Sequence, residues 1–115
     1  MNFFHTTEEA ISTAVIMGDL KTLKTLLKFA QDKNPVVYED EYNGKLTVLH
    51  LASYYGHKNI ITWFKDILDF YDINLVNGKG ITPLKLALQQ HQYEVMELYI
   101  DNGYKGMLFL NIIIQ

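Results

Sequence analysis

The sequence predicts an all-α protein, a solenoid of stacked helix–turn–helix repeats. Similar segments recur along the chain at intervals of 35 and 38 residues. Signals for helix starts and helix turns fall at matching places in each copy, and the alternation typical of strands is nearly absent. A single repeat of this size cannot bury its apolar side alone, so neighbouring repeats must stack.

The repetition is clearest between the second and third copies. Thr47-Val-Leu-His-Leu-Ala52 aligns with Thr82-Pro-Leu-Lys-Leu-Ala87, and an Asn-Gly pair precedes each segment. A weaker first copy places Ala14-Val-Ile-Met-Gly18 on Ala52-Ser-Tyr-Tyr-Gly56. The spacing predicts one domain, 1–115, with repeats at about 6–40, 41–75 and 76–105 and an apolar tail at 106–115. The longer first interval predicts a short insertion within Gln31–Tyr42.

Helix starts are marked by capping residues. Thr82 is suited to the N-cap because its hydroxyl can accept an amide hydrogen of the first turn, and Pro83 fits the next position, where its missing N–H has no cost. Thr6 and Glu9 have the spacing of a capping box in the first unit.

Turns between paired helices are marked by Gly18 and Gly56. Glycine adopts the left-handed conformation that ends a helix without steric cost. His91 holds the equivalent position in the third unit, so we expect it at positive φ with some strain.

The composition excludes several functions. The chain has 115 residues, 49% hydrophobic and 20% charged, with a net charge of −3, which disfavours nucleic-acid binding. Without cysteine there is no disulfide or thiolate metal site, and no apolar run is long enough to span a membrane. The first residues lack the pattern of a secretory signal, so we expect a cytoplasmic protein, with a secreted effector as an open alternative. All ten basic residues are lysine, which makes tyrosine and tryptophan the expected interface anchors.

Several segments resemble the ankyrin repeat. Gly44-Lys-Leu-Thr-Val-Leu-His-Leu-Ala-Ser-Tyr-Tyr-Gly-His57 is similar to the family pattern G-x-T-P-L-H-x-A-A-x-x-G-H, and Gly80-Ile-Thr-Pro-Leu-Lys-Leu-Ala87 is similar to it again. The resemblance covers about residues 6–104. It implies short hairpin-like loops between repeats, a turn fixed by Thr47 and His50, and a non-catalytic role in binding another protein.

The chain departs from the family pattern at three places. Lys85 stands where the pattern has histidine, and Gly44 lies one residue farther from Thr47 than the pattern requires. The tail Gly106–Gln115 does not resemble a repeat. Its apolar segment Met107–Ile114 could cap the stack, pair with a second copy in self-association, or mark part of a longer array.

No pattern for catalysis, a metal or a cofactor is present. The four histidines lack the i, i+4 spacing of a helical zinc site, and no nucleophile motif or phosphate-binding glycine loop occurs. His50 is expected to be structural, and Trp63 to lie in the core. We therefore expect no enzymatic activity, no metal site and no cofactor.

The resemblance implies that a partner protein is bound by the concave face of the stack, through the hairpin tips and the exposed ends of the first helices. At the tips these positions are Tyr42, Lys45, Leu46, Lys79 and Ile81, and at the helix ends they are Tyr54, Tyr55, Gln89 and Gln90. Ile16 and Met17 are the equivalent pair in the first unit, where we expect Phe3 and Phe4 to shield them.

The Tyr54–Tyr55 pair is the strongest candidate for an interface. Tyrosine offers a large contact area, few rotors and a hydroxyl for specificity. The alternative is that one of the two rings packs against a neighbouring repeat.

Overall fold

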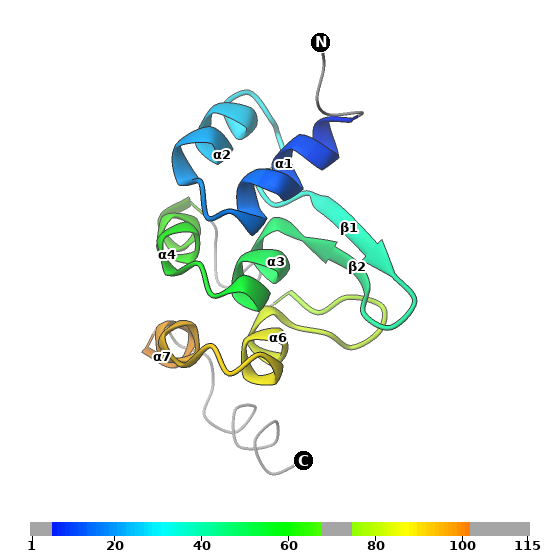
Figure 1. Cartoon of the computed structure of the whole chain (residues 1–115), viewed down its shortest axis with the longest axis vertical. Helices are drawn as coiled ribbons and strands as arrows, with labels where there is room; N and C mark the ends of the chain where they lie inside the picture. The colour runs from blue at the N-terminus through cyan, green and yellow to red at the C-terminus, as the bar shows by residue number, and fades with distance from the viewer. Residues whose placement is uncertain (1–5, 68–74, 102–115) are drawn as a thin grey trace.

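The computed structural model describes residues 6–67 and 75–101, which form three helix pairs in two layers (Figure 1). The first helices of the pairs, α1, α3 and α6, form one layer, with the connecting loops projecting beyond them (Figure 1). The second helices, α2, α4 and α7, form the other layer. The bounds are α1 Thr7–Ile16, α2 Leu20–Leu27, α3 Val48–Tyr55, α4 Lys58–Ile67, α6 Pro83–Gln89 and α7 Tyr93–Asp101.

The connection between the first two pairs, expected to be hairpin-like, is a β-hairpin with paired strands. Strand β1, Val36–Asp40, pairs antiparallel with β2, Gly44–Thr47. The expectation of an all-α fold is thus right for most of the described chain but misses this small sheet. The register shifts between Val36 and Tyr38, so Val37 is an extra, bulged residue. A bulge in so short a strand interrupts the alternation by which strands are recognised in a sequence.

The predicted caps are present. Thr6 Oγ1 accepts a hydrogen bond from the Glu9 amide at 3.0 Å, and Thr82 Oγ1 accepts one from the Lys85 amide at 3.1 Å. Pro83 occupies the first turn of α6. These residues begin α1 and α6 at the positions that the sequence predicts.

Helix α3 begins in a buried network that satisfies its first amides. The Val48 amide donates to the Pro35 carbonyl at 3.1 Å, and the Leu49 amide donates to Asn34 Oδ1 at 2.8 Å. The His50 amide donates to Thr47 Oγ1 at 3.3 Å. Asn34 and Pro35 belong to the predicted insertion, which therefore has a structural role at this helix start.

The His50 ring joins the second unit to the third. Its Nδ1 accepts a hydrogen bond from the Thr47 amide at 3.2 Å, and its Nε2 lies 3.0 Å from the Ile81 carbonyl oxygen. A carbonyl can only accept, so Nε2 carries the hydrogen and the ring is neutral. Burial lowers the pKa of His50, and this effect exceeds the opposing one of its hydrogen bond to Ile81.

A second buried polar contact ties α7 to α3. Tyr99 is 2% exposed, and its hydroxyl lies 2.5 Å from Ser53 Oγ. Ser53 Oγ in turn donates to the Leu49 carbonyl at 2.8 Å, so the Tyr99 hydroxyl is the donor to Ser53. The pairing removes the cost of burying both hydroxyls.

The turns between the paired helices of the first and second units are each bonded by a side chain from the next repeat. His57 Nε2 donates to the Ile16 carbonyl at 2.7 Å, and Gln92 Nε2 donates to the Tyr54 carbonyl at 3.0 Å. A Cβ on Gly18 would lie 2.7 Å from His57 Nδ1, and one on Gly56 would collide with the Gln92 amide. Both glycines have left-handed φ, of 70° and 76°, a conformation that glycine adopts without strain.

We expect the free energy of unfolding to decrease as the pH falls below about 6.5, because the unfolded chain then binds a proton at His50 that the folded chain resists. The stabilising contribution of the neutral ring is complete above that pH and is lost as the pH falls toward the lowered pKa of the folded state. His50→Gln should lower stability at pH 7.5 by about 1–3 kcal/mol and flatten this pH dependence. Urea unfolding at pH 7.5, 6.5 and 5.5 measures both effects, and an unchanged pH slope in the variant would contradict the assignment.

His91 has φ of 58°, as predicted, and its side chain is exposed. His91→Gly should therefore stabilise the protein, by about 0.5–1 kcal/mol, because relief of the left-handed Cβ cost exceeds the added entropy of the unfolded chain. Thermal unfolding should show a melting temperature higher by a few degrees. Gly56→Ala is the matched control and should be destabilising. A lower melting temperature for His91→Gly would show that the strain is absent.

Candidate partner-binding groove

A hollow lies between the hairpin and the C-terminal end of α3. Its lining residues are Ile16, Tyr38, Asp40, Asn43, Leu46, Leu51, Tyr54 and Tyr55, and its volume is about 130 Å³. Cofactors and drug-sized ligands occupy pockets of about 300 Å³ or more. The hollow therefore has the size for one side chain.

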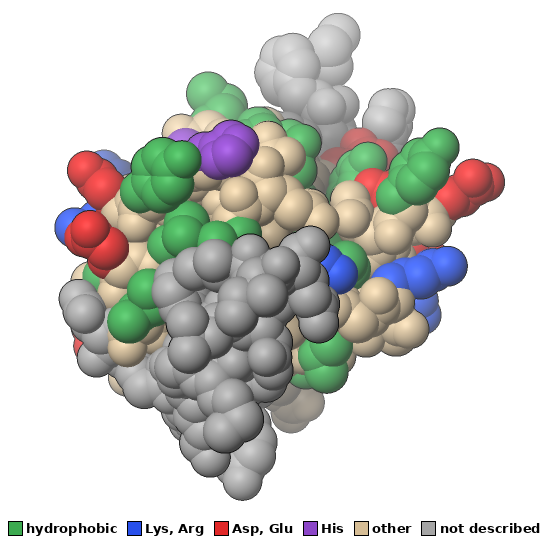
Figure 2. Space-filling view, turned by 90° about the horizontal axis from the view of Figure 1, so that it is seen from below, with side chains coloured by type: hydrophobic (Ala, Val, Ile, Leu, Met, Phe, Trp, Pro, Cys, Tyr) green, Lys and Arg blue, Asp and Glu red, His purple; other side chains and the backbone are tan. Residues whose placement is uncertain are grey.

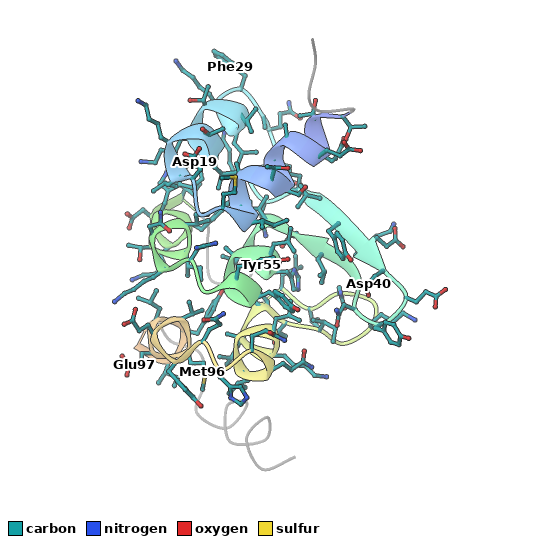
Figure 3. All side chains as sticks on the ribbon, in the orientation of Figure 1. Asp19, Phe29, Asp40, Tyr55, Met96 and Glu97 are labelled. Atoms are coloured by element: carbon teal, nitrogen blue, oxygen red, sulfur yellow. The ribbon has the colours of Figure 1, made fainter. Side chains whose placement is uncertain are left out.

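The Tyr54–Tyr55 pair lines this hollow from α3; Figure 3 labels Tyr55 on that helix and Asp40 on the hairpin. The two rings meet edge to face, with centroids 4.9 Å apart at an interplanar angle of 67°. Tyr54 is half-buried and packs against the core, whereas Tyr55 is 40% exposed. The packing alternative thus applies to Tyr54, and Tyr55 stays a candidate for the interface.

Most of the other predicted contact residues are at the surface. Tyr42 is 87% exposed at the hairpin tip. The remaining exposed candidates are Lys45, Lys79, Gln89 and Gln90.

Leu46 and Ile81 were expected at the surface, and here the prediction is wrong. They are 2% and 6% exposed and belong to the core. Each directly precedes the threonine that caps a first helix, at Thr47 and Thr82. An apolar residue at that position commonly packs against the first turns of the helix, which is the signal that would have placed both inside.

Asn77 holds the second loop against the hairpin. Its Nδ2 donates to the carbonyls of Asn43 and Lys45, at 2.6 and 3.0 Å. Its Oδ1 accepts the amides of Lys79 and Ile81, at 2.9 and 3.0 Å. One amide group therefore fixes the position of the third unit's loop beside the second unit's hairpin.

Tyr38 and Asp40 line the hollow but were not predicted as contact residues. Tyr38 is 48% exposed. The bulge at Val37 shifts the register and decides which way the next residues point, and a bulge of this kind leaves no clear signal in the sequence. Asp40 lies in the acidic run Glu39–Glu41, which as a sequence is typical of a solvated edge.

The first unit contributes Ile16 to the hollow. Ile16 and Met17 are 42% and 74% exposed, although the first residues of the chain were expected to shield them from solvent. Phe3 and Phe4 lie outside the described residues, as does the tail segment Met107–Ile114.

Trp63 is in the other helix layer, away from the hollow. It was expected to lie in the core, and it is half-buried and packs against the core. Its ring centroid lies 4.9 Å from that of Phe64. Lys24 Nζ lies 5.8 Å from the Trp63 ring centroid, a cation–π contact between α2 and α4.

Within residues 6–67 and 75–101, no group of three or more histidine, aspartate or glutamate side chains is arranged to hold a metal ion. None of the helices described is long and apolar enough to cross a membrane.

Comparison with known families matches residues 11–108 to the family described as "Ankyrin repeats (3 copies)". The chain belongs to the ankyrin-repeat family. Ankyrin repeats are generally protein–protein interaction modules and are typically non-catalytic.

Two relatives illustrate the range of proteins that carry this fold. The chain is 27% identical over 100 residues to the Arabidopsis thaliana protein named "Putative E3 ubiquitin-protein ligase XBAT31", covering 78% of this chain and 21% of that protein. It also matches, with a TM-score of 0.64 and 26% identity, a chain in the structure of the Bd0816 predatory endopeptidase from Bdellovibrio bacteriovorus in complex with immunity protein Bd3460. That match covers 84% of this chain and 47% of the other. The ankyrin-repeat chain thus spans about a fifth and about half of these two relatives.

The different burial of the two tyrosines predicts different effects on stability. Tyr54→Ala should lower the free energy of unfolding by about 1–3 kcal/mol because it removes a ring packed on the core. Tyr55→Ala should change it by less than about 1 kcal/mol. Chemical unfolding of the two variants measures the difference. Equal losses would show that Tyr55 is also part of the core.

Proposed function

We propose that this chain binds another protein through its groove face. This face consists of the exposed hairpin and loop tips and the exposed ends of the first helices: Tyr38, Tyr42, Lys45, Tyr54, Tyr55, Lys79, Gln89 and Gln90. The observation that carries the proposal is the position of the Tyr54–Tyr55 pair at a hollow of side-chain size. Aromatic rings beside a pocket are typical of residues that contribute most to binding energy in protein interfaces.

The rigidity of the surroundings supports the same function. Gln92 holds the Tyr54 carbonyl, and Asn77 fixes the loop beside the hairpin. A face held in this way loses little conformational entropy when a partner binds. The similarity to a chain from an endopeptidase–immunity protein complex is consistent with a role in protein association.

Affinity capture from the native cell followed by mass spectrometry would supply candidate partners, and variants of the chain would then test the proposal. Tyr55→Ala should weaken binding by about tenfold or more while leaving the fold intact. Phe29→Ala is the matched control, because Phe29 is 91% exposed and lies at the far end of the molecule from Tyr55 (Figure 3).

Isothermal titration calorimetry with each captured protein measures the two affinities. Equal binding by the wild-type chain and Tyr55→Ala, or an equal loss with Phe29→Ala, would rule out the groove face as the interface.

A further inference from the structure

The proposed function raises the question of which side chain enters the hollow. Resting on that function, we infer that the hollow receives one lysine or arginine side chain of the partner protein. Its lining combines apolar residues, three aromatic rings and a single carboxylate, the combination that suits a cation carried on an apolar stem.

The apolar part of the lining matches the stem of such a side chain. Ile16, Leu46 and Leu51 present aliphatic surface. Lysine and arginine bury three or four methylene groups along apolar surface while the charged head reaches a polar site. The side chains of Tyr38, Tyr54 and Tyr55 also line the hollow, and an aromatic ring attracts a cation placed over its face.

Asp40 supplies the partner for the charged head. Its Oδ1 accepts the amides of Tyr42 and Asn43, at 2.9 and 2.6 Å, which fixes the carboxylate in the hairpin turn. Its Oδ2 accepts one long hydrogen bond, 3.4 Å from Asn43 Nδ2. This oxygen therefore has capacity for a strong hydrogen bond from an ammonium or guanidinium group.

Acidic residues outnumber basic ones by three to two in the hairpin and the tip of the neighbouring loop. Glu39 and Glu41 flank Asp40 in the sequence, while Lys45 lies opposite Glu39 in the strand register and Lys79 packs over Gly44. Neither lysine is a lining residue. Figure 2 shows these two kinds of charge together on the side of the molecule where Figure 1 places the hairpin.

Other occupants fit less well. An acidic side chain would meet Asp40 with no cation in the lining, and like charges at close range repel. A neutral apolar side chain would remove water from Asp40 Oδ2 without replacing the lost hydrogen bond, which costs free energy.

A matched pair of small probes tests the inference on the full chain. n-Butylguanidinium and n-butylurea have nearly the same shape, and only the first is charged. Titration followed by amide chemical shifts should show saturable changes at Tyr38, Asp40 and Tyr55, with at least fivefold tighter binding of the guanidinium probe. Equal binding of the two probes, or no saturable shift at these residues, would overturn the inference.

Two variants distinguish the effect of the Asp40 carboxylate from the effect of the overall charge of the hairpin. Asp40→Asn keeps an oxygen for the two turn amides and should reduce the preference for the cation to less than twofold. Glu41→Gln makes the same charge change outside the lining and should keep the preference. A loss of equal size in Glu41→Gln would show a non-specific charge effect and overturn the inference.

Tyr38→Leu provides a second test in case Asp40→Asn does not fold. Tyr38 is about half exposed, so we expect its replacement to leave the fold intact. It should weaken binding of the guanidinium probe about threefold and leave that of n-butylurea unchanged. An unchanged preference in this variant would count against the aromatic part of the site.

The affinities of the variants for the captured partner protein distinguish a failure of this inference from a failure of the proposed function. If Tyr55→Ala loses the partner while Asp40→Asn binds it with full affinity, the groove face is the interface and the lysine or arginine inference is wrong. If Tyr55→Ala binds as well as the wild-type chain, the proposed function itself fails. Tenfold weaker binding by Asp40→Asn, with Glu41→Gln unaffected, is the result that we expect.

Discussion

The arrangement of the second and third units depends on one buried imidazole ring. His50 bonds to Thr47 at the start of α3 and to the Ile81 carbonyl in the next unit's loop. Because α3 has only eight residues, fixing its start also fixes the end that carries Tyr54 and Tyr55. The same ring therefore contributes both to the spacing of two repeats and to the position of the aromatic pair at the hollow, together with the bonds made by Asn77 and Gln92.

The features predicted best from the sequence are those set by local backbone chemistry. A threonine hydroxyl three residues before a free amide, a proline in a first turn and a glycine in a left-handed turn each act within a few residues of themselves. Thr6, Thr82, Gly56 and His91 accordingly have the conformations expected of them. The stacking of the repeats followed from their recurrence, because each needs a neighbour to cover its apolar side.

The bulge in the hairpin and the hollow beside it were harder to predict because they depend on strand register. Val37 adds one residue to β1, and that residue determines that Tyr38 and Asp40 line the hollow. Leu46 and Ile81 were predicted to be exposed because they lie beside the loop tips. They are buried instead, because each directly precedes the start of a helix and packs into the core there. In a short irregular strand, pairing with the neighbouring strand determines which side of the sheet each side chain points to. The spacing of residues along the sequence does not reveal that pairing.

The contacts between repeats make the groove face a property of the whole stack. His57 and Gln92 bond the last turns of α1 and α3, and Asn77 bonds the hairpin from the loop of the third unit. The hollow is lined by Ile16 of the first unit and by Tyr54 and Tyr55 of the second. No single repeat could therefore reproduce this surface, and a stack cut at a repeat boundary would lose part of it.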